Sequence, residues 1–370
     1  MKHLVMLGAG HAHVHMLSTL ASHPLAGVQI TLVAPYPRQL YSGMAPGFVA
    51  GHYKLEDCAI HLAPLLAHSG VQWLQHSAVG LDADARMLTL DDGSTLSFDV
   101  LSVNTGAVQD RQKIEEMMPG ARQHALFVRP IESFGALWPQ VVDLAHDQPL
   151  RAAVIGGGTA GIELACAVGF RLKGSSVTLV AGDAPVAASF SQGVQRRITQ
   201  ALRQRHITVI QERATGVSAT EVQLGNGTQL ACDVPIVAVG AQSPGWLQDS
   251  GLALDSQGCI AVDAFQRSTS HPQIFATGDV STRVDRDLAR SGANAVQAGV
   301  PLANNLRAVL TGVAPRPFTP QVKTLNLLAC GDKYAIASWG SWSAEGRWVW
   351  WLKDRIDRSF VRKYRQSAPD

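Results

Sequence analysis

The chain has 370 residues, of which 46% are hydrophobic and 16% charged, and it contains 34 glycines. This composition is typical of a compact α/β protein and excludes a disordered chain or a coiled coil. At this length we expect two or three domains. The formal net charge of +2 is too small to indicate a nucleic-acid-binding surface, so we expect no nucleic-acid partner.

The first predicted strand, at residues 3–7, leaves no room for a signal peptide before it, so we expect a cytoplasmic protein. Residues 152–170 are the most apolar stretch, but they include Glu163 and a glycine-rich turn. We therefore predict no membrane-spanning helix. The cysteines form no C-x-x-C pair, which disfavours a zinc site and favours reduced thiols. They are Cys58, Cys166, Cys232, Cys259 and Cys330.

A glycine-rich turn follows the first predicted strand. Gly8 permits a tight turn, and Gly10 lets the backbone approach a pyrophosphate at the positive N-terminus of the helix expected through Leu20. A second apolar strand at residues 29–33 completes the unit, although His13 replaces the third glycine that usually allows close helix packing. The pattern predicts a dinucleotide-binding fold.

The second glycine-rich turn is complete. Gly156, Gly158 and Gly161 follow an apolar strand at residues 152–155 and open a helix that leads to another apolar strand at 177–180. Each unit builds one pyrophosphate cradle, so two units predict two dinucleotides, one a flavin and the other a nicotinamide. The predicted fold class is α/β with two Rossmann-like domains.

Residues 90–94 and 224–228 have tight hairpin-turn sequences in equivalent places of the two halves. They indicate an internal structural duplication. From Pro315 onward we expect a short β-rich stretch and then a helix.

Two later segments carry a family resemblance. Residues 232–241 look like a strand that returns the chain to a flavin domain, and residues 274–279 look like a second flavin motif. Together with both glycine turns, they resemble the pyridine nucleotide-disulfide oxidoreductases, which have a glutathione-reductase-like fold. The resemblance implies a discontinuous FAD-binding domain, an NAD(P)H-binding domain and a small C-terminal segment. These would span residues 1–110 with 245–315, residues 111–244 and residues 316–370, respectively.

Within this superfamily the chain resembles the type II NADH dehydrogenase-like proteins and the flavoprotein module found fused to selenophosphate synthetase. The resemblance covers essentially the whole chain. The segments that carry it are residues 41–47, 295–306, 331–337 and 346–358.

The resemblance implies FAD as cofactor and NADH or NADPH as co-substrate. Asp279 would hydrogen-bond the ribityl or pyrophosphate region of FAD, and Glu163 would face the nicotinamide or flavin unless it is a carboxylate favoured by the helix dipole alone. The expected FAD contacts are Gly8, Gly10, His11, His13, Ser42, Gly106, Gly278, Asp279, Ala295 and Gln297. The expected NAD(P)H contacts are Gly156, Gly158, Gly161, Glu163 and Gly240.

The nucleotide-specificity positions depart from the usual pattern. Ala34 and Ala181 stand at the ends of the second strands, where an acidic residue normally holds a ribose hydroxyl. Asp183 follows two residues late, and Arg196 or Arg197 could meet a 2′-phosphate. The choice between NADH and NADPH stays open.

The cysteines decide between redox chemistries. Only Cys58 lies where disulfide reductases carry two reactive cysteines, so we expect no dithiol chemistry there. Cys166 is expected in the core. Cys330 falls in the segment that covers the flavin in related proteins, which is the basis of a sulfide oxidoreductase alternative.

Three histidines at alternate positions, His11, His13 and His15, resemble a metal-ligand pattern. Alternation is the period of a strand, whereas a helix would turn these side chains apart. We therefore expect no metal site, and we expect His11 and His13 to line the flavin phosphates or to pack in the interior.

The implied reaction is hydride transfer from the nicotinamide to the flavin, followed by a half-reaction with an electron acceptor. A quinone is the expected acceptor, although Ala293 replaces a glutamine that type II dehydrogenases tend to carry. The alternatives are a module serving a selenophosphate synthetase partner and a sulfide:quinone oxidoreductase. The candidate catalytic residues are Glu163, Gln297, Lys323 and Cys330.

The tail predicts an amphipathic basic helix. Seven basic and two acidic residues between Arg347 and Arg365 give this segment a net charge of +5. We expect residues 346–365 to bind the inner face of a membrane peripherally, with packing on the flavin domain or a homodimer interface as the alternative. The expected apolar stripe is Trp348, Val349, Leu352, Ile356, Phe360 and Tyr364.

Overall fold

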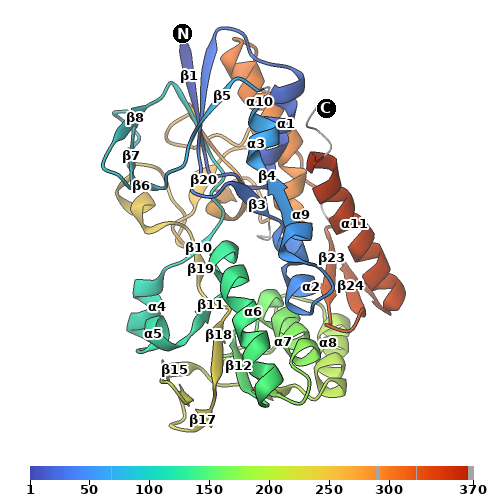
Figure 1. Cartoon of the computed structure of the whole chain (residues 1–370). Coiled ribbons are helices and arrows are strands. Elements are labelled where there is room, and N and C mark those ends of the chain that lie inside the picture. The colour runs from blue at the N-terminus through green and yellow to red at the C-terminus, as the bar shows by residue number, and fades with distance from the viewer. Residues whose placement is uncertain (68, 289–291, 322, 366–370) are drawn as a thin grey trace.

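The computed structural model describes residues 1–67, 69–288, 292–321 and 323–365. Two five-stranded parallel sheets form its frame, one in the upper half and one in the lower half of Figure 1. Most strand residues are buried and apolar, because helices or small sheets cover both faces of each parallel sheet. The predicted α/β fold class with two Rossmann-like units is confirmed.

The first sheet consists, in spatial order, of β21 (Ile274–Ala276), β9 (Val100–Val103), β1 (Lys2–Leu7), β2 (Val28–Val33) and β5 (Val71–Leu74). Helices α1 (His11–Ser22) and α10 (Gly299–Leu310) pack against each other and share a hydrophobic core with β1 and β2. Strand β21 comes from much later in the chain than its parallel neighbour β9. Two separated stretches of sequence therefore build this sheet.

The second sheet consists of β11 (Leu126–Phe127), β18 (Val234–Val237), β12 (Arg151–Ile155), β13 (Ser176–Val180) and β14 (Thr208–Ile210). Its main core contains the apolar faces of α6 (Ile131–Asp147), α7 (Thr159–Arg171) and α8 (Gln192–Gln204). The glycine turns after β1 and β12 lead directly into α1 and α7, as the glycine patterns predict.

Each parallel sheet carries a small antiparallel sheet. One contains β6 (Ala78–Asp82), β7 (Met87–Leu90) and β8 (Thr95–Ser97), and the other β15 (Ala214–Val217), β16 (Glu221–Leu224) and β17 (Gln229–Ala231). Gly93 and Gly227 take φ values of 82° and 84° in the second turn of each, a conformation that favours glycine. Both predicted hairpins, and the duplication they indicate, are confirmed.

The chain crosses between the two parallel sheets twice, and the crossings pair with each other. Strand β10 (Val108–Gln109) is antiparallel to β19 (Ala241–Gln242). The Gln109 side chain donates hydrogen bonds to the carbonyls of Val237 and Val239 at 2.9 and 2.8 Å. The shorter elements are β3 (Arg38–Leu40), α2 (Ala45–Val49), β4 (Ala59–His61), α3 (Leu62–Leu66), α4 (Arg111–Met117), α5 (Ala121–His124), β20 (Ile260–Val262), β22 (Ser281–Arg283) and α9 (Gly292–Gln297).

The last part of the chain forms an antiparallel sheet and a long helix. The strands are β23 (Leu325–Ala329), β24 (Ala335–Trp339) and β25 (Trp342–Gly346), and the helix is α11 (Arg347–Arg365). Helix α11 runs along one side of the molecule from β24 toward α1 (Figure 1). Within the described ranges, no helix is long and apolar enough to cross a bilayer.

The predicted apolar stripe of α11 is wrong in part. The buried face instead contains Lys353 and Asp357, which form an ion pair of 2.7 Å, while Trp348 and Trp351 are 55% and 58% exposed. The helix can bury these charges because they neutralise each other and the ammonium also donates to the Gly43 carbonyl at 2.7 Å. The prediction of an apolar stripe rested on the assumption that the charged residues of the helix face solvent.

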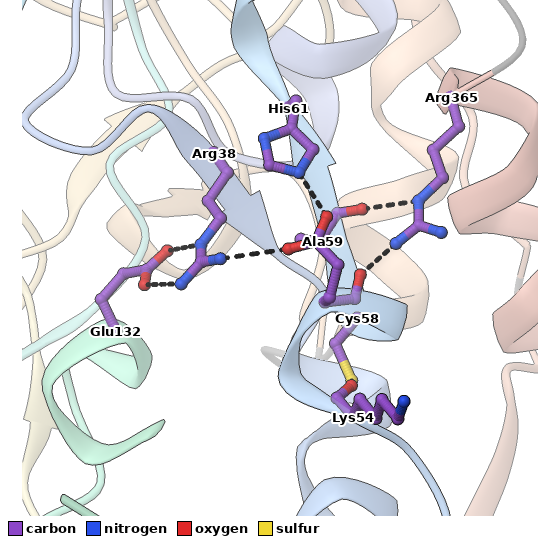
Figure 2. A network of polar contacts seen from close by, with 8 residues as sticks. Arg38, Lys54, Cys58, Ala59, His61, Glu132 and Arg365 are labelled. Carbon is purple, nitrogen blue, oxygen red and sulfur yellow. Dashed lines mark hydrogen bonds and ion pairs between the residues drawn. The ribbon is translucent and has the colours of Figure 1, made fainter. Parts of the chain in front are cut away.

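A polar network joins three distant parts of the chain (Figure 2). Arg38 on β3 forms two hydrogen bonds of 3.1 Å to the Glu132 carboxylate on α6, and it also bonds Glu56. Arg365 at the end of α11 donates to the Ala59 carbonyl at 3.0 Å. These contacts tie α6 and α11 to the segment between β3 and β4.

Candidate functional site

The first glycine turn leaves no space for side chains at two positions. A methyl group on Gly8, whose φ is +84°, would lie 2.6 Å from the Cα of Thr105. A methyl group on Gly10 would lie 2.3 Å from the Asn104 Oδ1. Both glycines are therefore required for the close approach of this turn to the end of β9.

Asn104 fixes the start of helix α1. Its Oδ1 accepts hydrogen bonds from the backbone N–H groups of Ala12 and His13 at 3.1 and 3.3 Å, and its Nδ2 donates to the Thr277 carbonyl at 2.8 Å. The residue is buried. The sequence prediction missed Asn104, although a polar residue directly after a buried strand was an available signal.

The alternate histidines contact different parts of the structure. His13 is buried beside the Gly8 carbonyl, whereas His15 lies 3.2 Å from the Tyr364 hydroxyl. His11 contacts the Tyr41 ring, and its Nε2 atom is buried without a hydrogen-bond partner. Burial lowers the pKa of His11 to about 4, so the ring is neutral.

Asp279 lies beside the first turn, together with a residue that the sequence prediction missed. The Arg129 guanidinium forms an ion pair of 3.3 Å with the Asp279 carboxylate and donates to the Ala107 carbonyl at 3.0 Å. It also borders Gly106, where a methyl group would lie 3.9 Å from the Arg129 Nη1. Arg129 lies two residues before α6, after the first crossing between the two parallel sheets, so a residue from the lower part of the molecule reaches the first cradle.

The remaining residues predicted for FAD lie around the same loops. A methyl group on Gly278 would contact Asn104 at 3.0 Å and Ala295 at 3.7 Å, and one on Gly292 would lie 4.0 Å from the Ser42 hydroxyl. Gln297, at the end of α9, accepts a hydrogen bond of 3.5 Å from the backbone of a nearby loop, at position 321. The fold thus brings together loops that are up to 250 positions apart in sequence.

The second glycine turn packs more tightly than the first. A methyl group on Gly161 would lie 1.8 Å from the Gly156 carbonyl oxygen, whereas one on Gly158 would meet no atom within 4 Å. Gly156, with a φ of +138°, lies against Val239 just before Gly240. Helix α7 therefore begins beside open space, as a pyrophosphate cradle requires.

Glu163 lies at the junction of α7, β23 and α11. Its carboxylate accepts a hydrogen bond of 2.7 Å from the Ala329 backbone N–H. Burial raises the pKa of Glu163 to about 7, and the Lys353 ammonium opposes that rise. Lys353 and Asp357 pair beside it, and the sequence prediction had assigned both to a solvent-facing side of the helix.

The end of strand β13 carries the expected ribose position. The Ala181 side chain has no oxygen that could accept a hydrogen bond from a ribose hydroxyl. The nearby Asp183 carboxylate pairs with the Arg213 guanidinium. Of the two arginines predicted to meet a 2′-phosphate, Arg197 instead bonds Ser343 and the C-terminal sheet at 3.2 Å. Arg196 donates to the carbonyl of its own helix, at position 192. Arg213 is therefore the guanidinium beside Asp183, and the sequence prediction missed it.

The thiols and Lys323 occupy different environments. Cys58 is buried, its pKa is raised to about 12 by burial, and its thiol lies 3.6 Å from the Lys54 carbonyl. The Cys330 thiol lies 3.8 Å from the Leu328 carbonyl, and the neighbouring Cys166 thiol, with burial, raises the pKa of Cys330. Lys323 is exposed, and its side chain lies along Gly340 in the turn of the C-terminal sheet.

Among the described residues, one group has ligand atoms close enough to hold a metal ion. It consists of His76, Asp91 and Asp92. The imidazole Nδ1 lies 2.7 Å from an Asp91 oxygen, and Nε2 lies 3.5 Å from an Asp92 oxygen. Because both ring nitrogens already face carboxylates, an ion pair accounts for this arrangement.

The residues of the two turns fit two dinucleotides. Both turns carry glycines at which a side chain would collide with backbone, and both lead into helix N-termini whose first residues are glycine-flanked. The unpartnered His11 Nε2 offers the first cradle a further polar contact. The donor set therefore suits a diphosphate at each turn.

Residues 2–299 match the family described as pyridine nucleotide-disulphide oxidoreductase, and the chain belongs to this family. It is an FAD-containing, NAD(P)H-dependent oxidoreductase. The resemblance expected from the sequence is confirmed.

Two curated relatives and one solved structure illustrate the range of the similarity. The ferredoxin–NAD(+) reductase component of the p-cumate 2,3-dioxygenase system of Pseudomonas putida is 29% identical over 89% of this chain and 81% of its own length. The demethylphylloquinone reductase NdbB of Synechocystis is 26% identical over 84% and 79%. NDH2 of Plasmodium falciparum superimposes with a TM-score of 0.81 at 14% identity, covering 100% of this chain and 99% of NDH2. The last similarity concerns the fold alone.

Proposed function

We propose that the enzyme passes reducing equivalents from NAD(P)H, through FAD, to a quinone. The observation that carries this proposal is the position of the Glu163 carboxylate, which accepts a hydrogen bond from the Ala329 N–H beside the buried Lys353–Asp357 pair. Burial there raises the pKa of Glu163 to about 7. Reduction of a quinone consumes protons, whereas reduction of an iron–sulfur protein transfers electrons alone. A group that exchanges a proton near neutral pH is therefore more useful for a quinone.

We assign FAD to residues 1–110 with 245–315 and the nicotinamide nucleotide to residues 111–244, with residues 316–370 covering the junction. When bound, the two cofactors supply the hydride-transfer chemistry. In this assignment Gly8 and Gly10 would admit the FAD pyrophosphate, and Asp279, held by Arg129, would hydrogen-bond the ribityl or pyrophosphate region. Glu163 holds the proton that the acceptor takes up.

The relatives support an acceptor outside the disulfide class. One is named a demethylphylloquinone reductase and another a ferredoxin–NAD(+) reductase. The buried Cys58 thiol, with its raised pKa and the Lys54 carbonyl as its contact, also speaks against dithiol chemistry at that position.

We further propose that the exposed face of α11 binds the membrane in which a quinone dissolves. Trp348 and Trp351 are exposed there, and Arg347, Arg355 and Arg362 are exposed on the same helix. Indole rings favour the headgroup boundary and cations favour anionic lipid. A homodimer interface on this face is the competing outcome, and a sedimentation measurement with and without vesicles separates the two.

The experiment is an anaerobic two-step reduction of the purified holoprotein. NADH or NADPH is added first, and the yellow absorbance should fall; a soluble quinone is added next, and the absorbance should return within one turnover. A parallel sample receives an oxidised ferredoxin. Reoxidation by ferredoxin but not by any quinone would overturn the quinone proposal, and a protein without flavin would overturn the cofactor assignment.

Sulfide oxidation is a second candidate because the Cys166 and Cys330 thiols are buried near each other, and Cys166 raises the pKa of Cys330. Two adjacent thiols can form a disulfide that accepts sulfide sulfur and passes electrons onward. Sulfide should then reduce the flavin without NAD(P)H, and Cys330→Ser should abolish that reduction. The selenium alternative predicts instead that the protein co-purifies with a selenophosphate synthetase and shows negligible quinone turnover.

A further inference from the structure

The two glycine turns differ in how the third position of the motif, on the helix, contacts the carbonyl of the first glycine. In the second turn, Gly161 packs directly against the Gly156 carbonyl, where even a methyl group would lie 1.8 Å from the oxygen. In the first turn the equivalent position is His13, and its imidazole Nδ1 lies 2.5 Å from the Gly8 carbonyl oxygen. The same helix position thus meets the same carbonyl, once by close packing and once by a hydrogen bond.

The hydrogen bonds of His13 define one tautomer. A carbonyl oxygen only accepts, so Nδ1 carries the proton that it donates to Gly8. Nε2 lies 2.8 Å from the Ser102 hydroxyl and therefore accepts its proton. The side chain is fully buried, and both ring nitrogens are satisfied.

Strand β9 and the residue directly after it hold the start of α1 through two alternate side chains. Ser102 contacts the His13 ring, and Asn104 accepts hydrogen bonds from the backbone of Ala12 and His13. Residues i and i+2 of a strand point to the same face, so both side chains lie toward the helix. Together they fix the helix N-terminus and the carbonyl of Gly8.

We propose that His13 is a positioning residue for FAD. It acts through the Gly8 carbonyl and holds the first turn in the conformation that receives the pyrophosphate, although the ring itself is buried behind that turn. The benefit is preorganisation: a turn already in its bound conformation loses less entropy when the cofactor binds. Loss of the hydrogen bond between the His13 ring and the Gly8 carbonyl should weaken FAD binding by about tenfold.

The test measures FAD release from the full-length holoprotein. His13→Gly recreates the residue of the second turn and should speed FAD release about tenfold, seen as a rise in flavin fluorescence on dilution. His13→Asn places an amide donor near the Nδ1 position and should restore most of the retention. His15→Ala is the matched control on the same helix and should release FAD as the wild type does.

Two further readouts separate positioning from a general loss of stability. Binding of a nicotinamide-free nucleotide such as ADP-ribose to the second turn should change less than about twofold in His13→Gly, and ¹⁵N NMR of the wild type should show the Nδ1–H tautomer. The proposal would be overturned if His13→Gly released FAD at the wild-type rate, or if FAD and ADP-ribose binding weakened equally. Detection of the Nε2–H tautomer in the wild type would also overturn it. If His13→Gly does not fold, Ser102→Ala, which removes the second hydrogen bond, provides the same measurement.

Discussion

The Lys353 ammonium lies 2.7 Å from the Asp357 carboxylate, one turn further along the same helix, and both residues are buried. Removal of one member leaves a buried charge without its counterion. We expect Lys353→Met to lower the free energy of unfolding by about 3–5 kcal/mol, measured by urea denaturation. The double variant with Asp357→Leu should recover part of this loss; equal losses in both variants would contradict the pairing argument.

Glu163 should make stability depend on pH. Burial raises its pKa from 4.5 to about 7, so the protonated form stabilises the fold and that contribution is lost as the pH rises through 7. Because the side chain is only partly buried, we expect a loss of about 1 kcal/mol between pH 4.5 and pH 8 in the wild type. The Glu163→Gln variant should not show this pH-dependent loss of stability. Parallel unfolding curves at pH 5 and pH 8 provide the measurement, and an unchanged difference between the two proteins would refute the raised pKa.

Two glycines of the second turn should separate folding from nucleotide binding. Gly161→Ala places a methyl group 1.8 Å from a carbonyl oxygen and should destabilise the protein by about 1–3 kcal/mol. Gly158→Ala enters open space and should change stability by less than about 0.5 kcal/mol, yet weaken NAD(P)H binding. Thermal unfolding and nucleotide titration distinguish the two; normal NAD(P)H affinity in Gly158→Ala would show that the nucleotide lies elsewhere.

The Asp183–Arg213 pair should set the balance between the two nicotinamide nucleotides. Asp183→Asn removes an anion that repels a 2′-phosphate and should raise the ratio of kcat/KM for NADPH over NADH by about tenfold. Arg213→Ala should lower the same ratio. Arg196→Ala is the control, since its guanidinium bonds its own helix. A ratio that no variant changes would place the adenosine ribose away from this pair.

The exposed tryptophans of α11 should anchor the protein to lipid. Trp348→Ser combined with Trp351→Ser should reduce binding to anionic vesicles by at least about tenfold, because each indole loses its burial at the headgroup boundary. Added salt should weaken the wild-type binding. Leu144→Ser, which changes a side chain that is 53% exposed on α6, should have no effect. Equal vesicle binding by all three proteins would exclude α11 as the anchor.

The sequence was sufficient for features that are local. Gly8 and Gly156 each follow a strand and precede a helix within ten residues, so pattern and spacing alone predict both turns. Asn104 and Arg129 escaped prediction because their partners, Thr277 and Asp279, are about 150 or more positions away in sequence. Chain topology, which no local pattern contains, brings these residues together.

The tail shows a second limit. An amphipathic pattern assigns charged residues to solvent, but Lys353 is buried because Asp357 and the Gly43 carbonyl satisfy it. The spacing of four residues allows the Lys353–Asp357 pair, but only the three-dimensional arrangement shows that the pair is buried and that the Gly43 carbonyl is within reach. Sequence patterns therefore fail where a charged group is buried with the help of a hydrogen-bond acceptor from another element.

The paired crossings of β10 and β19 restrict how the two halves of the molecule can move. A single connecting strand allows the two parts that it joins both to bend and to rotate relative to each other. Two strands that are hydrogen-bonded side by side resist this rotation. Here the Gln109 side chain strengthens the pairing through its hydrogen bonds to the carbonyls of Val237 and Val239. Together with the ion pair between Arg38 and Glu132, this pairing opposes rotation of one parallel sheet relative to the other, so the two glycine turns keep their relative orientation.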